Sequence, residues 1–159
     1  MKPHILALLE LDENSAQVVD SLKDIDRRTT VCKKFTKAIE LLEEKRCALI
    51  ISDVHLENGG NVFDFLRWAK ANPLTKDTPF VLLSCKPTKM AKYVEDGVRT
   101  TARLLGADLF LTFESFDPVS FRNQIEPLLL VDSQKQRASR KTVGVKDTNQ
   151  QAKNHEEKE

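Results

Sequence analysis

The stretch LIISDVHLENGG, residues 49–60, places a carboxylate at the end of an apolar segment. Residues 49–52 have the composition of a buried β-strand without a titratable side chain, and Asp53 follows them directly. A turn with Gly59 and Gly60 comes next. In open α/β sheets the chemistry takes place at the carboxyl ends of the strands, whereas aspartates are also common in turns. Asp53 is therefore either a reacting group or a residue that caps the turn.

Apolar segments alternate with segments of helical periodicity on both sides of this stretch, as far as about Val131. We expect strands at 4–11, 29–35, 47–52, 78–84 and 107–113, and helices at 14–25, 36–46, 61–73, 86–106 and 117–130. The third strand is apolar on both faces, as a central strand of a parallel sheet must be, and the second is weak enough to lie near an edge. Five βα units of this kind predict an α/β fold with a parallel sheet.

The helix ends carry recognisable signals. Asn14 or Ser15 is expected to be the N-cap of the first helix, and Asp117, followed by a proline, the N-cap of the last. Gly97 lies in the middle of the long fourth helix, where a kink or a break is possible. Pro127 removes a backbone hydrogen bond and is expected to bend the last helix.

The chain of 159 residues is long enough for one domain, which we place at 1–131. Residues 132–159 are polar and charge-mixed, cannot bury enough apolar surface to offset their ordering entropy, and are predicted to form a disordered tail. Lys and Arg number 25 against 24 Asp and Glu, a net charge of +1. Such a balance supplies no field for binding nucleic acid or an anionic membrane, so neither is an expected partner.

The cysteines are Cys32, Cys47 and Cys85, an odd number at scattered spacings. They fit small core residues in a reducing compartment better than disulfides or a zinc site. No apolar run approaches the ~18 residues of a membrane span, and the N-terminus has no signal-peptide cleavage pattern. We therefore expect a cytoplasmic protein. His4 and His155 are expected to be surface groups.

Four stretches follow one another along the chain: MKPHILALLELDEN at the front, LIISDVHLENGGNVFDFLR around Asp53, TPFVLLSC, and GADLFLTFESFDP. In this order and at similar spacing, they resemble motifs of the receiver domain of bacterial response regulators. The resemblance covers residues 1 to about 130. It implies a flavodoxin-like (βα)5 fold, a doubly wound five-stranded parallel sheet, and a stand-alone receiver-like protein in phosphorelay (two-component) signal transduction.

The resemblance also implies a set of site residues. Asp53 matches the phosphoacceptor, and Ser84 matches the hydroxyl that contacts the phosphoryl group. Receivers hold a Mg²⁺ ion between acidic side chains and a backbone carbonyl; the matching positions here are Glu10, Asp53 and the carbonyl of His55. The metal offsets the repulsion between an attacking carboxylate and an anionic phosphoryl group.

Two positions depart from the receiver pattern. The acidic pair after the first strand retains one acid, because the pair falls on Leu9-Glu10 or, shifted by one, on Glu10-Leu11. The lysine of the fifth strand is replaced by Phe113. Lys86, two residues after Ser84, starts from the same rim of the sheet and is a possible substitute. These departures describe a degenerate, pseudo-receiver-like member.

Two functions therefore remain open. In the first, Asp53 accepts a phosphoryl group from a histidine kinase or phosphotransfer protein, and the chain itself is not expected to be an enzyme. Output then passes by contact with a downstream protein, or in a homodimer, through the face formed by 86–106, 107–113 and 117–130. In the second, the chain is a pseudo-receiver, an interaction module that is independent of phosphorylation.

A third function, a flavodoxin-like enzyme or cofactor binder, is disfavoured. Residues 10–17, ELDENSAQ, follow the first strand and contain no glycine. A phosphate-binding loop at this point needs glycines so that the backbone can approach the phosphate.

Overall fold

The computed structural model describes residues 2–56 and 60–130. The strands are β1 (His4–Leu8), β2 (Thr29–Cys32), β3 (Cys47–Asp53), β4 (Phe80–Cys85) and β5 (Leu109–Phe113). The helices are α1 (Asp12–Leu22), α2 (Phe35–Glu44), α3 (Val62–Ala71) and α4 (Lys89–Leu104), followed by a last helix at 118–130. The tail predicted at 132–159 lies outside the described residues.

The five strands form one parallel sheet in the order β2-β1-β3-β4-β5. This order confirms the predicted flavodoxin-like, doubly wound α/β fold, and β2 lies at an edge as expected. From β1 the chain continues to β2 at one edge of the sheet, whereas from β3 it continues to β4 toward the other edge. The direction of the strand order therefore reverses between β1 and β3. In sheets of this kind the reversal opens a crevice beyond the carboxyl ends of the strands. Glu10 follows β1 and Asp53 ends β3, the two strands that border this crevice.

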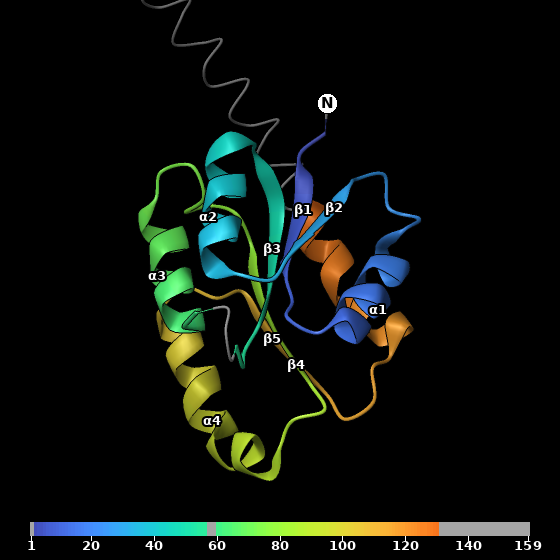
Figure 1. The fold of residues 1–159 in the computed structure, drawn as a ribbon, viewed down its shortest axis with the longest axis vertical. Coiled ribbons are helices and arrows are strands. Elements are labelled where there is room, and N and C mark those ends of the chain that lie inside the picture. Colours follow the sequence, from blue (N-terminus) through green and yellow to red (C-terminus); the bar gives the residue numbers. More distant parts are fainter. Residues whose placement is uncertain (1, 57–59, 131–159) are drawn as a thin grey trace, which may run out of the picture.

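Helices cover both faces of the sheet (Figure 1). Helices α2, α3 and α4 pack on one face, where Phe65 contacts Phe80 of β4 edge-on, with ring centroids 5.3 Å apart. Helix α1 and the last helix pack on the other face through Val18, Leu22, Phe121, Ile125 and Leu129. Strand β3 is buried along its whole length because Ile50 faces the first layer while Leu49 and Ile51 face the second. These two layers fix the strand that carries Asp53.

Helix α1 begins earlier than the sequence indicated. Its first residue is Asp12, and its N-cap is Leu11, whose side chain makes no capping hydrogen bond. The prediction of Asn14 or Ser15 as the N-cap is wrong: Asn14 is buried within the helix, and the hydroxyl of Ser15 donates to the Leu11 carbonyl. Asp12 and Glu13 occupy the first turn, where the helix dipole favours negative charge.

Three further predictions concern Gly97, Asp117 and Pro127. Helix α4 is continuous through Gly97, so the possible break is not observed. Asp117 caps the last helix as predicted, since its Oδ1 accepts from the N–H groups of Val119 and Ser120. Pro127 lies within the helical residues 118–130, and the bend there stays a prediction.

His4 is buried, and the expectation of a surface position is wrong. It begins β1, which lies between β2 and β3. Its Nδ1 is 3.2 Å from the Thr30 hydroxyl, whereas its buried Nε2 has no hydrogen-bond partner among the described residues. Pairing on both sides of β1 buries a residue that the sequence places near a chain terminus.

Candidate functional site

Asp53 is the last residue of β3 and is 6% exposed. It pairs in register with Leu83 of β4, and the Val54 N–H that follows donates to the Leu83 carbonyl across 3.1 Å. The sheet therefore holds the backbone on both sides of the carboxylate. The side chain thus lies at the carboxyl edge of the sheet, and its burial shields it from most of the solvent.

The carboxylate of Asp53 is held by the main chain of the segment that connects β1 to α1. The backbone N–H of Glu10 donates to Oδ2 of Asp53 across 2.9 Å, so the contact spans the crevice between the ends of β1 and β3. Burial raises the pKa of Asp53 to about 6; the Glu10 N–H lowers it and the negative charge of Glu10 raises it again. A carboxylate with this pKa is mostly ionised at neutral pH and carries a charge that burial opposes.

A hollow of about 300 Å³ opens above Asp53. It is lined by Glu10, Leu11, Asn14, Asp53, His55, Leu83, Ser84, Cys85, Lys86, Pro87 and Thr88. All four residues predicted from the sequence, Asp53, Ser84, Glu10 and His55, thus lie around one hollow. Their chemical roles stay predictions, because proximity alone assigns none of them.

Ser84 and Cys85 form the β4 side of this hollow. Ser84 is 4% exposed and pairs with Thr112 of β5. Burial raises the pKa of the Cys85 thiol to about 11, the charges of Asp53 and Glu13 raise it as well, and Lys86 lowers it. The thiol is therefore mostly protonated at neutral pH, which makes it a weak nucleophile. The serine hydroxyl is the neutral hydrogen-bond donor that this strand contributes to the hollow.

Phe113 does not occupy the hollow above Asp53. Its ring packs edge-on against Phe116, with centroids 5.4 Å apart, and Phe116 in turn contacts Phe121 of the last helix. Phe113 belongs to the apolar layer on that face of the sheet and is not among the residues that line the hollow. Strand β5 therefore supplies an aromatic anchor in place of the lysine that the receiver pattern has there.

The positively charged side chain among the lining residues is that of Lys86. Its Nζ lies 2.9 Å from Oε1 of Glu13, in the first turn of α1. The sequence placed Lys86 on the rim but gave no partner for it, and it gave no role to Glu13. Since α1 was predicted to start two residues later, Glu13 fell outside the expected helix, and its contact with the β4–α4 turn had no sequence signal.

The donors that could hold a metal ion are two carboxylates and one backbone carbonyl. Among residues 2–56 and 60–130, no cluster of three or more His, Cys, Asp or Glu side chains is arranged to bind a metal ion. Mg²⁺, however, is commonly bound through one or two carboxylates with water completing the shell. The raised pKa of Asp53, caused mainly by burial, describes a charge that a cation would stabilise. By their chemistry, Glu10, Asp53 and the His55 carbonyl thus fit Mg²⁺, with water completing the shell.

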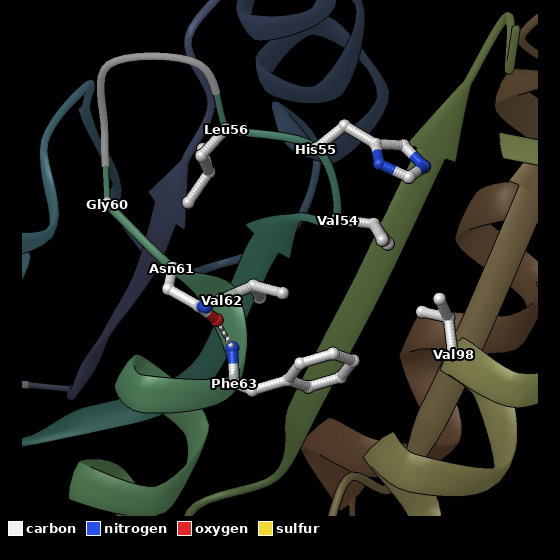
Figure 2. A pocket seen from close by; sticks show the side chains of 8 residues that line it. All are labelled: Val54, His55, Leu56, Gly60, Asn61, Val62, Phe63 and Val98. Atoms are coloured by element: carbon white, nitrogen blue, oxygen red, sulfur yellow. Dashed lines mark hydrogen bonds between the residues drawn. The ribbon is translucent and has the colours of Figure 1, made fainter. Parts of the chain in front are cut away.

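A second hollow, of about 680 Å³, lies beyond the end of β3 (Figure 2). Its walls are Val54, His55, Leu56, Gly60, Asn61, Val62, Phe63 and Val98. Asn61 caps α3 there, its Oδ1 accepting from the Phe63 N–H across 2.8 Å. Figure 2 shows the ring of His55 directed away from Asn61 and Phe63, and His55 also lines the hollow above Asp53. No sequence motif predicted a site at this second hollow, and among residues 2–56 and 60–130 no Asp, Glu, Lys or Arg side chain lines it.

Comparison with known proteins identifies the fold. No protein-family model and no curated protein matches the chain. Among solved structures, it is similar to the signal receiver domain of a signal transduction histidine kinase from Syntrophus aciditrophicus, with 22% identity, 80% of this chain and 90% of that chain covered, and a TM-score of 0.65. It is also similar to the chemotaxis response regulator CheY4 of Vibrio cholerae. The sequence identity is 20%, 80% of this chain and 99% of that chain are covered, and the TM-score is 0.66.

A third similar structure is the signal receiver domain of a putative LuxO repressor protein from Vibrio parahaemolyticus. The sequence identity is 16%, 87% of this chain and 98% of that chain are covered, and the TM-score is 0.72. The chain therefore has the fold of response-regulator receiver domains over the described residues, which confirms the fold that the resemblance implied. No helix among those residues is long and apolar enough to cross a membrane.

Proposed function

We propose that the chain is a receiver-like protein of phosphorelay signal transduction in which Asp53 accepts a phosphoryl group. The observation that carries this proposal is the position of Asp53 at the carboxyl end of β3, in a hollow that also contains Glu10 and Ser84. A buried carboxylate with a raised pKa at such a crevice is typical of functional sites.

The residues around the hollow have distinct tasks in this proposal. The Glu10 N–H fixes one oxygen of Asp53, so that the carboxylate is oriented before it attacks the phosphorus of the donor. Ser84 donates its hydroxyl to an oxygen of the transferred group. Glu10, Asp53 and the His55 carbonyl would hold Mg²⁺, which, when bound, supplies positive charge against the phosphoryl oxygens. Asp53 is itself modified, so the chain acts as an acceptor and not as an enzyme with turnover.

The donor in this proposal is a histidine kinase or a phosphotransfer protein. Output uses the face of α4, β5 and the last helix, where a downstream protein or a second copy binds. Large apolar side chains are exposed there: Met90 is 70%, Tyr93 is 86% and Val119 is 69% exposed. The large apolar side chains Met90 and Tyr93 in the first half of α4 therefore face solvent, as expected of a contact surface.

A second candidate is the pseudo-receiver, a module that binds a partner without phosphorylation. One observation favours it: Phe113, at the position of the receiver lysine, is committed to packing with Phe116 and cannot offer a charge to a phosphoryl group. Leu9, at one position of the acidic pair, is fully buried in the same apolar layer. Both residues stabilise the fold and supply nothing to phosphoryl chemistry.

Incubation with Mg²⁺ and acetyl phosphate, followed by intact-mass measurement, separates the two candidates. The receiver function predicts a gain of one phosphoryl group that Asp53→Ala abolishes and that Asp20→Ala, at an exposed ion-paired carboxylate of α1, leaves unchanged. Beryllofluoride, a phosphoryl mimic, should shift the amide resonances around the hollow in the same Asp53-dependent way. If neither reagent acts on the wild-type protein at millimolar concentration, the pseudo-receiver is the correct function.

A further inference from the structure

The hollow above Asp53 has a cation on its rim that comes from β4 and not from β5. Lys86 follows the end of β4 and lines the hollow together with Asp53 and Ser84. A phosphoryl group on Asp53 would add negative charge to a hollow that already holds Glu10 and Asp53. Without a lysine on β5, charge neutralisation there depends on the groups that line this hollow.

The backbone at Lys86 is held in an unusual conformation. Its φ is 49°, in the left-handed region that side chains other than glycine rarely adopt, and it precedes Pro87, which restricts it further. The Lys86 N–H donates to the Phe113 carbonyl across 2.7 Å. This bond ties the turn to the end of β5, at the residue where the receiver pattern has its lysine. Strain of this kind persists where the surrounding structure holds it, and it concentrates at functional sites.

The ion pair between Lys86 and Glu13 is easily exchanged. The Nζ to Oε1 distance is 2.9 Å, but the two side chains are 62% and 60% exposed. Exposed ion pairs of this type contribute little to stability, less than a charge-assisted hydrogen bond to a phosphoryl oxygen. The lysine stem is flexible, and Lys86 lines the same hollow as Asp53 while its Nζ contacts Glu13. A change of side-chain rotamer is therefore enough to direct the ammonium from Glu13 toward a group on Asp53.

We propose that Lys86 is the phosphoryl-binding cation of this protein, and that its ammonium leaves Glu13 to contact the phosphoryl group on Asp53. This inference rests on the proposed phosphoacceptor function of Asp53. When an oxygen of Asp53 bonds to the phosphorus of acetyl phosphate, the bond from phosphorus to the acetate oxygen breaks and acetate leaves. Lys86 donates hydrogen bonds to the transferred group and exchanges no proton, so its charge is unchanged.

The exchange also changes the contacts of α1. Before phosphorylation, Lys86 connects the β4–α4 turn to Glu13 in the first turn of α1. After it, this connection is broken and the carboxylate of Glu13 returns to solvent. Phosphorylation thus changes a contact on the α1 side of the hollow, the ion pair of Lys86 with Glu13. Phe113 of β5 has no charge and cannot make such a contact.

The test is the dissociation constant for beryllofluoride in the presence of Mg²⁺, from amide resonance shifts of the full chain. Lys86→Met should weaken binding by about tenfold or more, the effect of losing a charged hydrogen bond. Lys92→Met is the matched control, because Lys92 is also ion-paired and exposed, but to Glu114 and outside the residues that line the hollow. It should leave the dissociation constant unchanged.

Two further variants keep the test decisive. Lys86→Gly removes the ammonium while it suits the left-handed backbone, so it should weaken binding as Lys86→Met does, with a thermal midpoint no lower than that of wild type. Glu13→Gln frees Lys86 and should tighten binding up to about fivefold.

The outcomes distinguish the inference from the proposed function. Asp53-dependent binding that is equal in wild type, Lys86→Met and Lys86→Gly would overturn the role of Lys86 and leave Asp53 as an acceptor. No binding by wild type would overturn both. A loss of binding in Lys92→Met as large as in Lys86→Met would show a general charge effect and would also overturn the specific role of Lys86.

Discussion

The backbone N–H of Glu10 and the Oδ2 of Asp53 lie 2.9 Å apart, joining the ends of two strands whose connections diverge to opposite faces of the sheet. The side chain and the backbone of Glu10 act on Asp53 in opposite directions. The N–H favours the ionised carboxylate and the negative side chain disfavours it, while burial, the largest effect, raises the pKa of Asp53 to about 6. The orientation of Asp53 is thus fixed by the main chain, and its charge is left for another group to offset.

This arrangement predicts that Asp53→Asn stabilises the metal-free protein near neutral pH. The pKa of Asp53 is raised from 3.8 to about 6 in the folded state, so the folded protein binds the proton more tightly than the unfolded chain. The stability that this provides is complete below pH 3.8 and is lost as pH rises through about 6. At neutral pH the ionised carboxylate costs up to about 3 kcal/mol. Asparagine keeps an acceptor for the Glu10 N–H and avoids that cost.

Urea unfolding of wild type and Asp53→Asn from acidic to neutral pH measures this difference. The advantage of Asp53→Asn should rise with pH by about 1–3 kcal/mol, and Mg²⁺ should reduce it, because the ion binds only the wild-type carboxylate. Asp20→Asn, at an exposed residue paired with Lys23, should change stability by less than about 0.5 kcal/mol at any pH. Equal stability of wild type and Asp53→Asn near neutral pH would contradict the raised pKa.

The same pKa predicts how phosphorylation depends on pH. Only the ionised carboxylate of Asp53 can attack phosphorus, and burial raises its pKa to about 6. The initial rate with acetyl phosphate should be flat above about pH 7 and should fall toward a tenfold loss per pH unit below the pKa. Because Mg²⁺ favours the ionised form, higher Mg²⁺ should move the midpoint to lower pH. A rate that stays constant down to about pH 5 at low Mg²⁺ would be inconsistent with this prediction.

The sequence predicted the five-stranded α/β fold because each strand has its own apolar run and each helix its own period. Such local signals hold for β3, which is buried on both faces, and for Asp117, which caps the N–H groups two and three positions later. The N-terminus of α1 was predicted wrongly because its cap, Leu11, has no capping side chain to mark it. Burial of Asn14 by the surrounding fold outweighed its preference for a cap position.

The site was predictable to a smaller extent. Motif spacing led to Asp53, Ser84, Glu10 and His55, and the fold brings these four to one hollow. The ion pair of Lys86 with Glu13 joins residues 73 positions apart and has no sequence signature. The packing of Phe113 away from the hollow depends likewise on the last helix, which the sequence places but does not orient.

His4 is predicted to lower stability at acidic pH. Burial lowers its pKa below 6.5, and the charges of Lys45 and Arg28 lower it as well, against a backbone contact with Lys45 that raises it. The folded state therefore binds the proton less tightly than the unfolded chain. The stability provided by neutral His4 is present above pH 6.5 and is lost as pH falls through the lowered pKa.

Asp53 titrates in the neighbouring range with the opposite sign, so this measurement belongs in the Asp53→Asn background. There, His4→Phe should reduce the loss of stability between neutral pH and about pH 5, measured by urea unfolding. Imidazole resonances of the folded parent provide the direct check. Titration of His4 at or above 6.5 would show that the ring is not desolvated as the structure indicates.

Helix α4 contains a site where a single methyl group should stabilise the protein. Gly97 is inside the helix, and a Cβ there meets nothing within 4 Å. Gly97→Ala should therefore raise the free energy of unfolding by about 0.5–1 kcal/mol, since alanine loses less backbone entropy on folding. Gly106→Ala is the matched control with the opposite sign: its φ is +103°, and the added Cβ would lie 3.2 Å from Cγ of Lys70.

Thermal and urea unfolding of both glycine variants test this reading of α4. Gly106→Ala should lose about 1 kcal/mol or more, because its backbone must stay in a region that alanine disfavours. A destabilised Gly97→Ala would mean that α4 needs the freedom of a glycine at its centre, as a kinked helix does. Since α4 bears the exposed Met90 and Tyr93, that result would also give this surface a mobility that a continuous helix does not have.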